Sequence, residues 1–213
     1  MKTFKIILIN ITIIATCYPF DIFVGGSSSL RKFDYAQYNF KGQRYYNNFV
    51  VGIEKELYVI SKSYSVSTKI YYIKKGFSGK LILNYETYDG VVAHFTGDIY
   101  HAYISTGIFL KRVIPFLMPE ISFIIGPRFD YAINHIEDYT GVEYSPETAG
   151  ILGKNFNNTD IGLDIGLELS MRNFAISYIY SENFSNSYST DLITIKNIAH
   201  QFIISSKIFD KWF

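Results

Sequence analysis

The chain has few of the residues that define several common protein classes. It holds one Cys and five Pro among 213 residues. A single Cys cannot form an internal disulfide or a CxxC metal site, which excludes disulfide scaffolds and zinc ribbons. Its 20 Lys and Arg balance 19 Asp and Glu, so the chain has no basic charge excess for binding nucleic acid. A hydrophobic fraction of 48% excludes a disordered chain.

The sequence has no apolar run long enough for a transmembrane helix, and a shorter apolar run lies near the N-terminus. Lys2 and Lys5 precede an apolar run that ends at Cys17, and this order predicts a secretory signal peptide over residues 1–17. The run is too short for a transmembrane helix, which needs about 20 apolar residues. Ala15 and Cys17 form an A-x-A-like cleavage site, and the alternative is that Cys17 is a lipid-modified first residue. The mature chain, residues 18–213, is then either soluble outside the cytoplasm or crosses a membrane as strands.

The residues that are abundant favour an all-β domain. The chain has 19 Tyr and 18 Phe, and its β-branched and aromatic residues outnumber strong helix formers. Residues 160–170 alternate large aliphatic side chains with acidic or small ones, which is the period of a strand with one apolar and one polar face. The same period predicts eight strands, at 20–28, 49–59, 63–72, 91–110, 118–131, 160–170, 174–181 and 195–209.

The connections between these strands differ in length on the two sides. Tight turns are predicted at 60–62, 111–114 and 172–173, and longer polar links at 30–48, 77–90, 132–158 and 183–194. Short turns on one side and long loops on the other are typical of outer-membrane barrels. We therefore predict an eight-stranded antiparallel up-and-down transmembrane β-barrel in the bacterial outer membrane. Pro127 cannot donate to a strand ladder, so Gly126-Pro127 predicts a bulge or kink.

The charged residues of the polar face are the candidate site. In a membrane barrel the aliphatic face points to lipid and the polar face lines a crowded lumen, where opposite charges need partners. The candidate lumen charge network consists of Glu54, Glu56, Lys69, Glu120, Arg128, Asp130, Asp164, Glu168 and Lys207. The alternative is a soluble barrel whose polar face is solvated. Tyr residues near strand ends and the terminal Trp212-Phe213 favour the membrane interpretation.

No motif for catalysis, metal or cofactor is present. The four His form no HExxH motif, and there is no G-x-S-x-G or Walker A sequence. We predict no catalytic, cofactor-binding or metal-binding residue. If the chain were a lipid-modifying enzyme, His135 and His200 would be the residues to test.

Three segments carry a resemblance to a known family. They are Gly52-Ile53-Glu54, the segment Tyr71-Tyr72-Ile73-Lys74-Lys75-Gly76-Phe77, and Gly126-Pro127-Arg128-Phe129-Asp130-Tyr131. On these residues the chain resembles the PorT-like, "outer membrane β-barrel domain" family, similar in architecture to OmpA and OmpX barrels. The resemblance implies a fold and a location, and it suggests a part in assembling a secretion apparatus.

The sequence thus predicts a non-enzymatic outer-membrane barrel with a side-chain-filled lumen. Its role would be structural or interactive, surrounded by outer-membrane lipids and contacting other envelope proteins through residues 30–48 and 132–158. Two alternatives stay open at this point. One is a soluble exported lipocalin-like barrel that binds an apolar ligand, and the other is a lipid-modifying outer-membrane enzyme.

Overall fold

A computed structural model of the chain describes residues 20–35, 41–84, 92–114, 120–141, 157–186, 188–189 and 193–207. Side chains are described over a smaller part of these strands. The expected signal peptide, residues 1–17, lies outside the described residues and stays a prediction. The described residues form no helix long and apolar enough to span a membrane.

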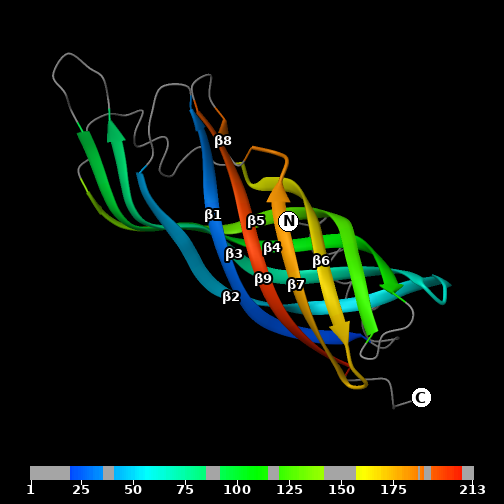
Figure 1. The fold of residues 1–213 in the computed structure, drawn as a ribbon. Coiled ribbons are helices and arrows are strands. Elements are labelled where there is room, and N and C mark those ends of the chain that lie inside the picture. The colour runs from blue at the N-terminus through cyan, green and yellow to red at the C-terminus, as the bar shows by residue number, and fades with distance from the viewer. Residues whose placement is uncertain are drawn as a thin grey trace, which may run out of the picture.

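The described residues form a closed antiparallel barrel. Its strands are β1 Asp21–Tyr35, β2 Lys41–Ser61, β3 Tyr64–Asn84, β4 Val92–Ile114, β5 Glu120–Gly141, β6 Thr159–Ser170, β7 Phe174–Asn183 and β9 Ile193–Lys207. Each pairs with the next, and β9 pairs with β1 to close the ring (Figure 1). The two-residue strand β8, Tyr188–Ser189, adds to β9. The prediction of an eight-stranded up-and-down antiparallel barrel is confirmed.

Two groups of strands run past the rim of the barrel: β2 to β5 together, and β1 with β9, which pair as far as Tyr35 and Ile193. Pairing of β1 with β2 ends at Ser29 and Tyr46, and pairing of β5 with β6 ends at Tyr131 and Thr159. Beyond these points β2, β3, β4 and β5 continue to pair with one another as far as Gly141. We call this part, residues 41–45, 77–84, 92–100 and 132–141, the sheet extension; Figure 1 shows it projecting from one end of the barrel.

The sheet extension corrects the predicted loops. Residues 30–48, 77–90 and 132–158 were expected to be connections, but β1 continues to Tyr35, β3 to Asn84 and β5 to Gly141. Alternation of polarity reveals a strand only where its two faces meet different surroundings. The sequence of the extension shows little regular alternation, so its pattern resembles a loop although the backbone pairs as a sheet.

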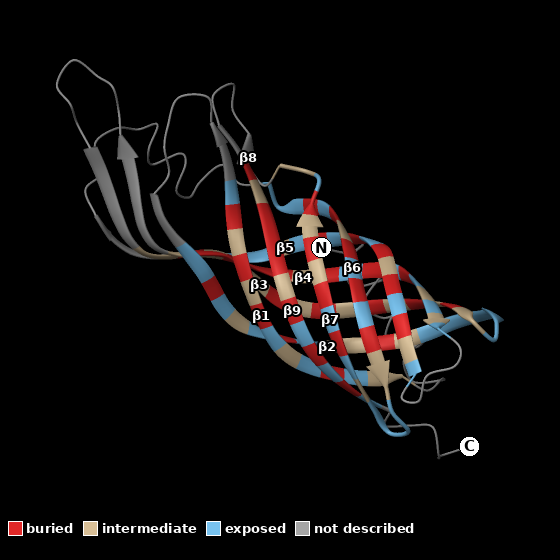
Figure 2. Ribbon diagram, viewed as in Figure 1, coloured by how far each residue is buried: buried red, intermediate tan, exposed pale blue. Residues whose placement is uncertain are grey.

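The barrel is apolar outside, and its interior is polar except for a buried cluster that includes Val50, Ile73 and Ile179. On β6, Ile161 is 54% exposed and Leu167 is 52% exposed, whereas Asp160, Asp164 and Glu168 between them are buried. Figure 2 shows the same alternation of buried and exposed residues along the neighbouring strands. The prediction that the aliphatic face of this strand points outward is confirmed. This polarity is the reverse of a soluble barrel, in which the apolar face points inward.

A bulge or kink was predicted at Gly126-Pro127, and the pairing shows that there is no bulge. Pro127 pairs in phase with Leu163 of β6, and the β4–β5 register is the same on both sides of it. The extra residue of β5 is instead Ile133, because Tyr103 pairs with Ala132 and Ala102 pairs with Asn134. The fixed φ of Pro suits an extended strand, so the missing N–H leaves a gap in the ladder to β4 without adding a residue.

Position 126 requires glycine for a separate structural reason. A Cβ there would lie 2.1 Å from the carbonyl oxygen of Ile108 and 2.8 Å from Cα of Phe109. The backbone of β4 therefore approaches β5 more closely than any side chain allows. The fully buried Phe109 ring also lies over Gly107, where a Cβ would meet Cζ of that ring at 2.6 Å.

We expect Gly126→Ala to destabilise the barrel. The new methyl group meets backbone that cannot move without breaking the ladder, and overpacking of this kind costs about 1–3 kcal/mol. Urea unfolding of the protein refolded into lipid vesicles measures the loss. Gly26→Ala is the matched control, because a Cβ at Gly26 meets nothing within 4 Å. Equal stability of the two variants would contradict the close approach.

Candidate functional site

The middle of the lumen is organised around Arg128. This fully buried guanidinium on β5 contacts Asp130 at 2.9 Å, and it also reaches Asp164 of β6 and Asn183 of β7. Nζ of Lys75, from β3, lies 2.6 Å from Asp130. Five strands of the barrel join here, since Ser105 of β4 also donates to Asp130 at 2.6 Å.

Asp160 lies at the centre of a second layer toward the sheet extension. It is fully buried and accepts hydrogen bonds from Asn183 at 2.8 Å, from the Tyr103 hydroxyl at 3.3 Å and from Asn197 at 3.4 Å. Asn183 therefore joins the Arg128 layer to the Asp160 layer through its oxygen and its nitrogen. Three strands, β4, β7 and β9, thus supply donors to a carboxylate on β6.

Lys111 organises a third layer, toward the short turns. Its Nζ lies 2.8 Å from Glu54 and 3.0 Å from Glu168, and Glu54 also pairs with Lys69 at 3.2 Å. Ser177 donates to Glu168 at 3.1 Å. Each carboxylate in this layer therefore has a cation and each cation has a carboxylate, which is the condition for holding charge away from water.

A plug of aromatic rings separates this layer from the middle of the lumen. The Lys69 ammonium lies 5.8 Å from the centre of the Phe23 ring and 5.4 Å from that of Phe109. Both rings are buried, and Phe23 packs at 6.0 Å against Tyr71. The lumen at this level is filled by side chains.

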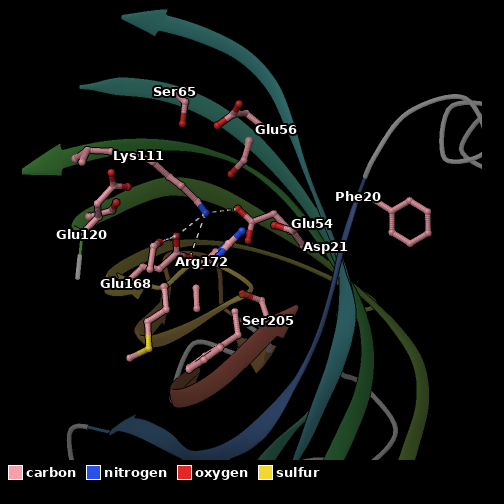
Figure 3. A pocket seen from close by; sticks show the side chains of 17 residues that line it. Phe20, Asp21, Glu54, Glu56, Ser65, Lys111, Glu120, Glu168, Arg172 and Ser205 are labelled. Atoms are coloured by element: carbon pink, nitrogen blue, oxygen red, sulfur yellow. Dashed lines mark hydrogen bonds and ion pairs between the residues drawn. The ribbon is translucent and has the colours of Figure 1, made fainter. Parts of the chain in front are cut away.

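A cavity of about 780 Å³ opens below the plug, at the short-turn end. Lys111 forms its inner wall with Glu54 and Glu168, as Figure 3 shows, and Glu56 and Glu120 lie toward its mouth. Serines line much of the remaining wall. The wall also contains the apolar side chains of Val113, Met171 and Phe174, and the cavity ends at the Lys111 layer.

The candidate residues divide into three groups. Glu54, Lys69, Arg128, Asp130, Asp164 and Glu168 are buried and share the contacts given above. Glu56 and Glu120 are exposed at the cavity mouth and form no ion pair with a described residue. Lys207 ends β9 opposite Asp21, and its side chain lies outside the described part.

Sequence reasoning missed four charged members of the lumen: Arg31, Lys75, Lys111 and Asp160. Lys75 is six residues after Lys69 on the same strand, so it shares the inward face, and that spacing could have identified it. Lys111 fell in a predicted turn and Arg31 in a predicted loop. With them the charged residues that are buried or paired inside the described lumen, apart from those at the cavity mouth, are five acids and five bases: Glu54, Asp130, Asp160, Asp164 and Glu168 against Arg31, Lys69, Lys75, Lys111 and Arg128.

The histidines do not form one site. His101 is buried beside Arg31, and its ring lies 4.1 Å from that of His135, at the end of the lumen toward the sheet extension. His200 is on the outer surface, where Nδ1 lies 2.7 Å from the Tyr178 hydroxyl. In the described part of the chain, no three His, Cys, Asp or Glu side chains are placed to hold a metal ion.

No protein-family model matches the chain, and no curated protein matches it significantly. Among solved structures the fold is similar to Ail, the attachment invasion locus protein of Yersinia pestis, in complex with the heparin analogue sucrose octasulfate. That match has 13% identity and a TM-score of 0.42, and it covers 89% of this chain and 98% of Ail. Neisserial surface protein A, NspA, gives 9% identity and a TM-score of 0.43 over 89% of this chain and 97% of that chain.

Because these identities and TM-scores are low, the barrel architecture rests on the strand pairing and not on these neighbours. The resemblance to the PorT-like family stays a prediction.

We expect Arg128→Met to reduce stability by about 3–5 kcal/mol, because it leaves Asp164 buried without a cation. Urea titration of the refolded protein, followed by gel mobility, measures the change. Lys62→Met is the control, since Lys62 is an exposed turn residue whose loss should change stability by less than about 0.5 kcal/mol. A loss no larger than that of the control would show that the lumen network contributes nothing to folding.

Proposed function

We propose that the protein is a bacterial outer-membrane β-barrel with a lumen filled by side chains and a structural or interaction role at the end that carries the sheet extension. The observation that carries this proposal is the reversed polarity of the barrel. Charged groups are buried and paired inside it, while large apolar side chains are exposed outside.

The outer surface supports a bilayer location. Exposed apolar residues occur on seven of the eight ring strands, among them Val24, Val51, Ile108, Phe129, Ile161, Ile176 and Phe202, and Val66 on β3 is partly exposed. Soluble monomers rarely expose a continuous apolar surface of this extent to water. A closed barrel also satisfies its backbone within the ring, which the interior of a bilayer requires. Outer-membrane lipids are then the first partner of the protein.

The interior supports a closed lumen. An eight-stranded barrel is just wide enough for side chains to fill it. Here the five acids and five bases of the described lumen are balanced, and Lys69 lies between the rings of Phe23 and Phe109. Ions or solutes would have to break these pairs to pass. We therefore propose that the protein does not act as a general pore.

The same interior disfavours the two alternatives. A lipocalin-like barrel needs an apolar cavity for its ligand, but the middle of this lumen holds paired charges around Arg128. For a lipid-modifying enzyme, His135 and His200 were the residues to test, and they do not form one site. They lie on different sides of the barrel wall, and His200 is engaged with Tyr178.

The interaction role is supported by open strand edges in the sheet extension. Within the described residues, no strand pairs with residues 133–141 on the β6 side of β5, or with residues 41–45 on the β1 side of β2. An open edge can accept an extended segment from a partner as an added strand. Both edges fall within the segments 30–48 and 132–158 predicted to contact envelope proteins. A PorT-like part in a secretion apparatus remains an expectation from resemblance.

Ile165→Arg tests the bilayer location. Ile165 is the central one of five outward aliphatic residues on β6, so a charge there should cost about 2–4 kcal/mol in lipid. Ser206→Arg is the matched control, because Ser206 is exposed at the short-turn end, where the expected cost is about 0–1 kcal/mol. Urea unfolding in vesicles measures both. In a soluble barrel the Ile165 variant would be as stable as wild type, and that outcome would reject the proposal.

Two measurements on the wild-type protein complete the test. Protein extracted in detergent should migrate differently on gels before and after heating, because the closed barrel resists unfolding until heated. In planar bilayers it should give no steady conductance, since the lumen is filled. A protein that is soluble without detergent would reject the membrane location, and a stable open channel would reject the closed lumen.

A further inference from the structure

The outer wall carries a small cationic patch toward the end of the barrel that bears the sheet extension. Lys32 of β1 and Lys196 of β9 are direct cross-strand partners, and both are on the outward face. Glu182 of β7 pairs with Lys32 at 3.0 Å and accepts a hydrogen bond from the Tyr180 hydroxyl at 3.0 Å. We call Lys32, Lys196, Glu182 and Tyr180 the rim patch.

The charges of the rim patch do not balance. Like charges placed directly opposite each other on adjacent strands repel, and the single carboxylate, Glu182, forms its ion pair with Lys32. Lys196 makes no ion pair with any described residue. The patch therefore has a net charge of +1, from two lysines and one glutamate, and the charge of Lys196 also acts on Glu182. An anion between the two lysines would remove their repulsion.

From the rim patch toward the short-turn end, the outward residues are first amphipathic and then apolar. The His200 ring lies 5.4 Å from the Tyr180 ring and 5.8 Å from that of Tyr45, and it is hydrogen-bonded to Tyr178. Next along the wall come Phe202, 62% exposed, and then the exposed Ile176 and Ile204. Tyr and His with one polar and one apolar end suit the interface between lipid headgroups and acyl chains.

We propose that the rim patch binds the phosphate of an anionic lipid headgroup, with the acyl chains of that lipid against Phe202, Ile176 and Ile204. This inference rests on the proposed bilayer location. The ammonium groups of Lys32 and Lys196 donate charge-assisted hydrogen bonds to the phosphate oxygens. The ion pair with Glu182 orients the Lys32 ammonium group at the edge of the site. Glu182 also limits the affinity of the site for phosphate, because a carboxylate repels a phosphate.

Native mass spectrometry of the full chain in detergent, with phosphatidylglycerol or phosphatidylcholine added, tests the site. Wild type should bind phosphatidylglycerol more tightly than phosphatidylcholine. Lys196→Gln should weaken phosphatidylglycerol binding about fivefold, the usual effect of one Lys at a lipid surface. Glu182→Gln should strengthen it, because the repelling carboxylate is gone while the lysines remain. Phosphatidylcholine binding should be the same in all variants.

Lys62→Gln is the matched control, as it removes the same charge from the exposed turn at the opposite end of the barrel. If this change weakens phosphatidylglycerol binding as much as Lys196→Gln, the attraction is general and the site is rejected. A Glu182→Gln variant with weaker binding would also reject it. If the protein is heat-modifiable but binds both lipids equally well, only this inference is overturned. If the protein is soluble without detergent, the bilayer location itself is overturned.

Discussion

The pairing of charges buried inside the barrel is the constraint on which the rest of the structure depends. Arg128 fixes the lateral position of β6 through Asp164 and of β7 through Asn183, and Lys75 ties β3 to the same centre through Asp130. A slip of one residue in any strand would move its charges to the outside and its aliphatic side chains inward. The polar interior and the apolar exterior therefore select the same register.

The fold could be predicted wherever the two faces of a strand meet different surroundings. On β6 every aliphatic residue faces out and every acid faces in, so strand, period and orientation follow from the amino acids alone. The sequence of the sheet extension shows little regular alternation of apolar and polar residues. Residues 30–48 and 132–158 were therefore predicted to be loops. Pro127 was predicted to force a bulge because it lacks a donor, but a gap in one ladder was sufficient.

The members of the lumen network could be predicted in part and their contacts hardly at all. Inward position follows from the odd or even place of a residue on its strand, which identified Glu54, Lys69 and Arg128. Lys111 was not predicted as a member of the network, because its segment was assigned to a turn. Lys75 and Asp130 come from strands that are not neighbours. Such contacts across the ring depend on how far the strands tilt and stagger on closure, which no local pattern records.

The seam between β1 and β9 has a consequence for the order of assembly. Seven of the eight pairings in the ring join strands that follow one another along the chain, whereas this one joins Asp21 to Lys207, near the two ends. Contacts so distant in sequence form slowly. The ring therefore closes only after the last strand has been synthesised. Until then the backbone groups along one edge of β1 have no partner strand. A nascent chain of this design needs protection from other strands until its last strand is available to pair.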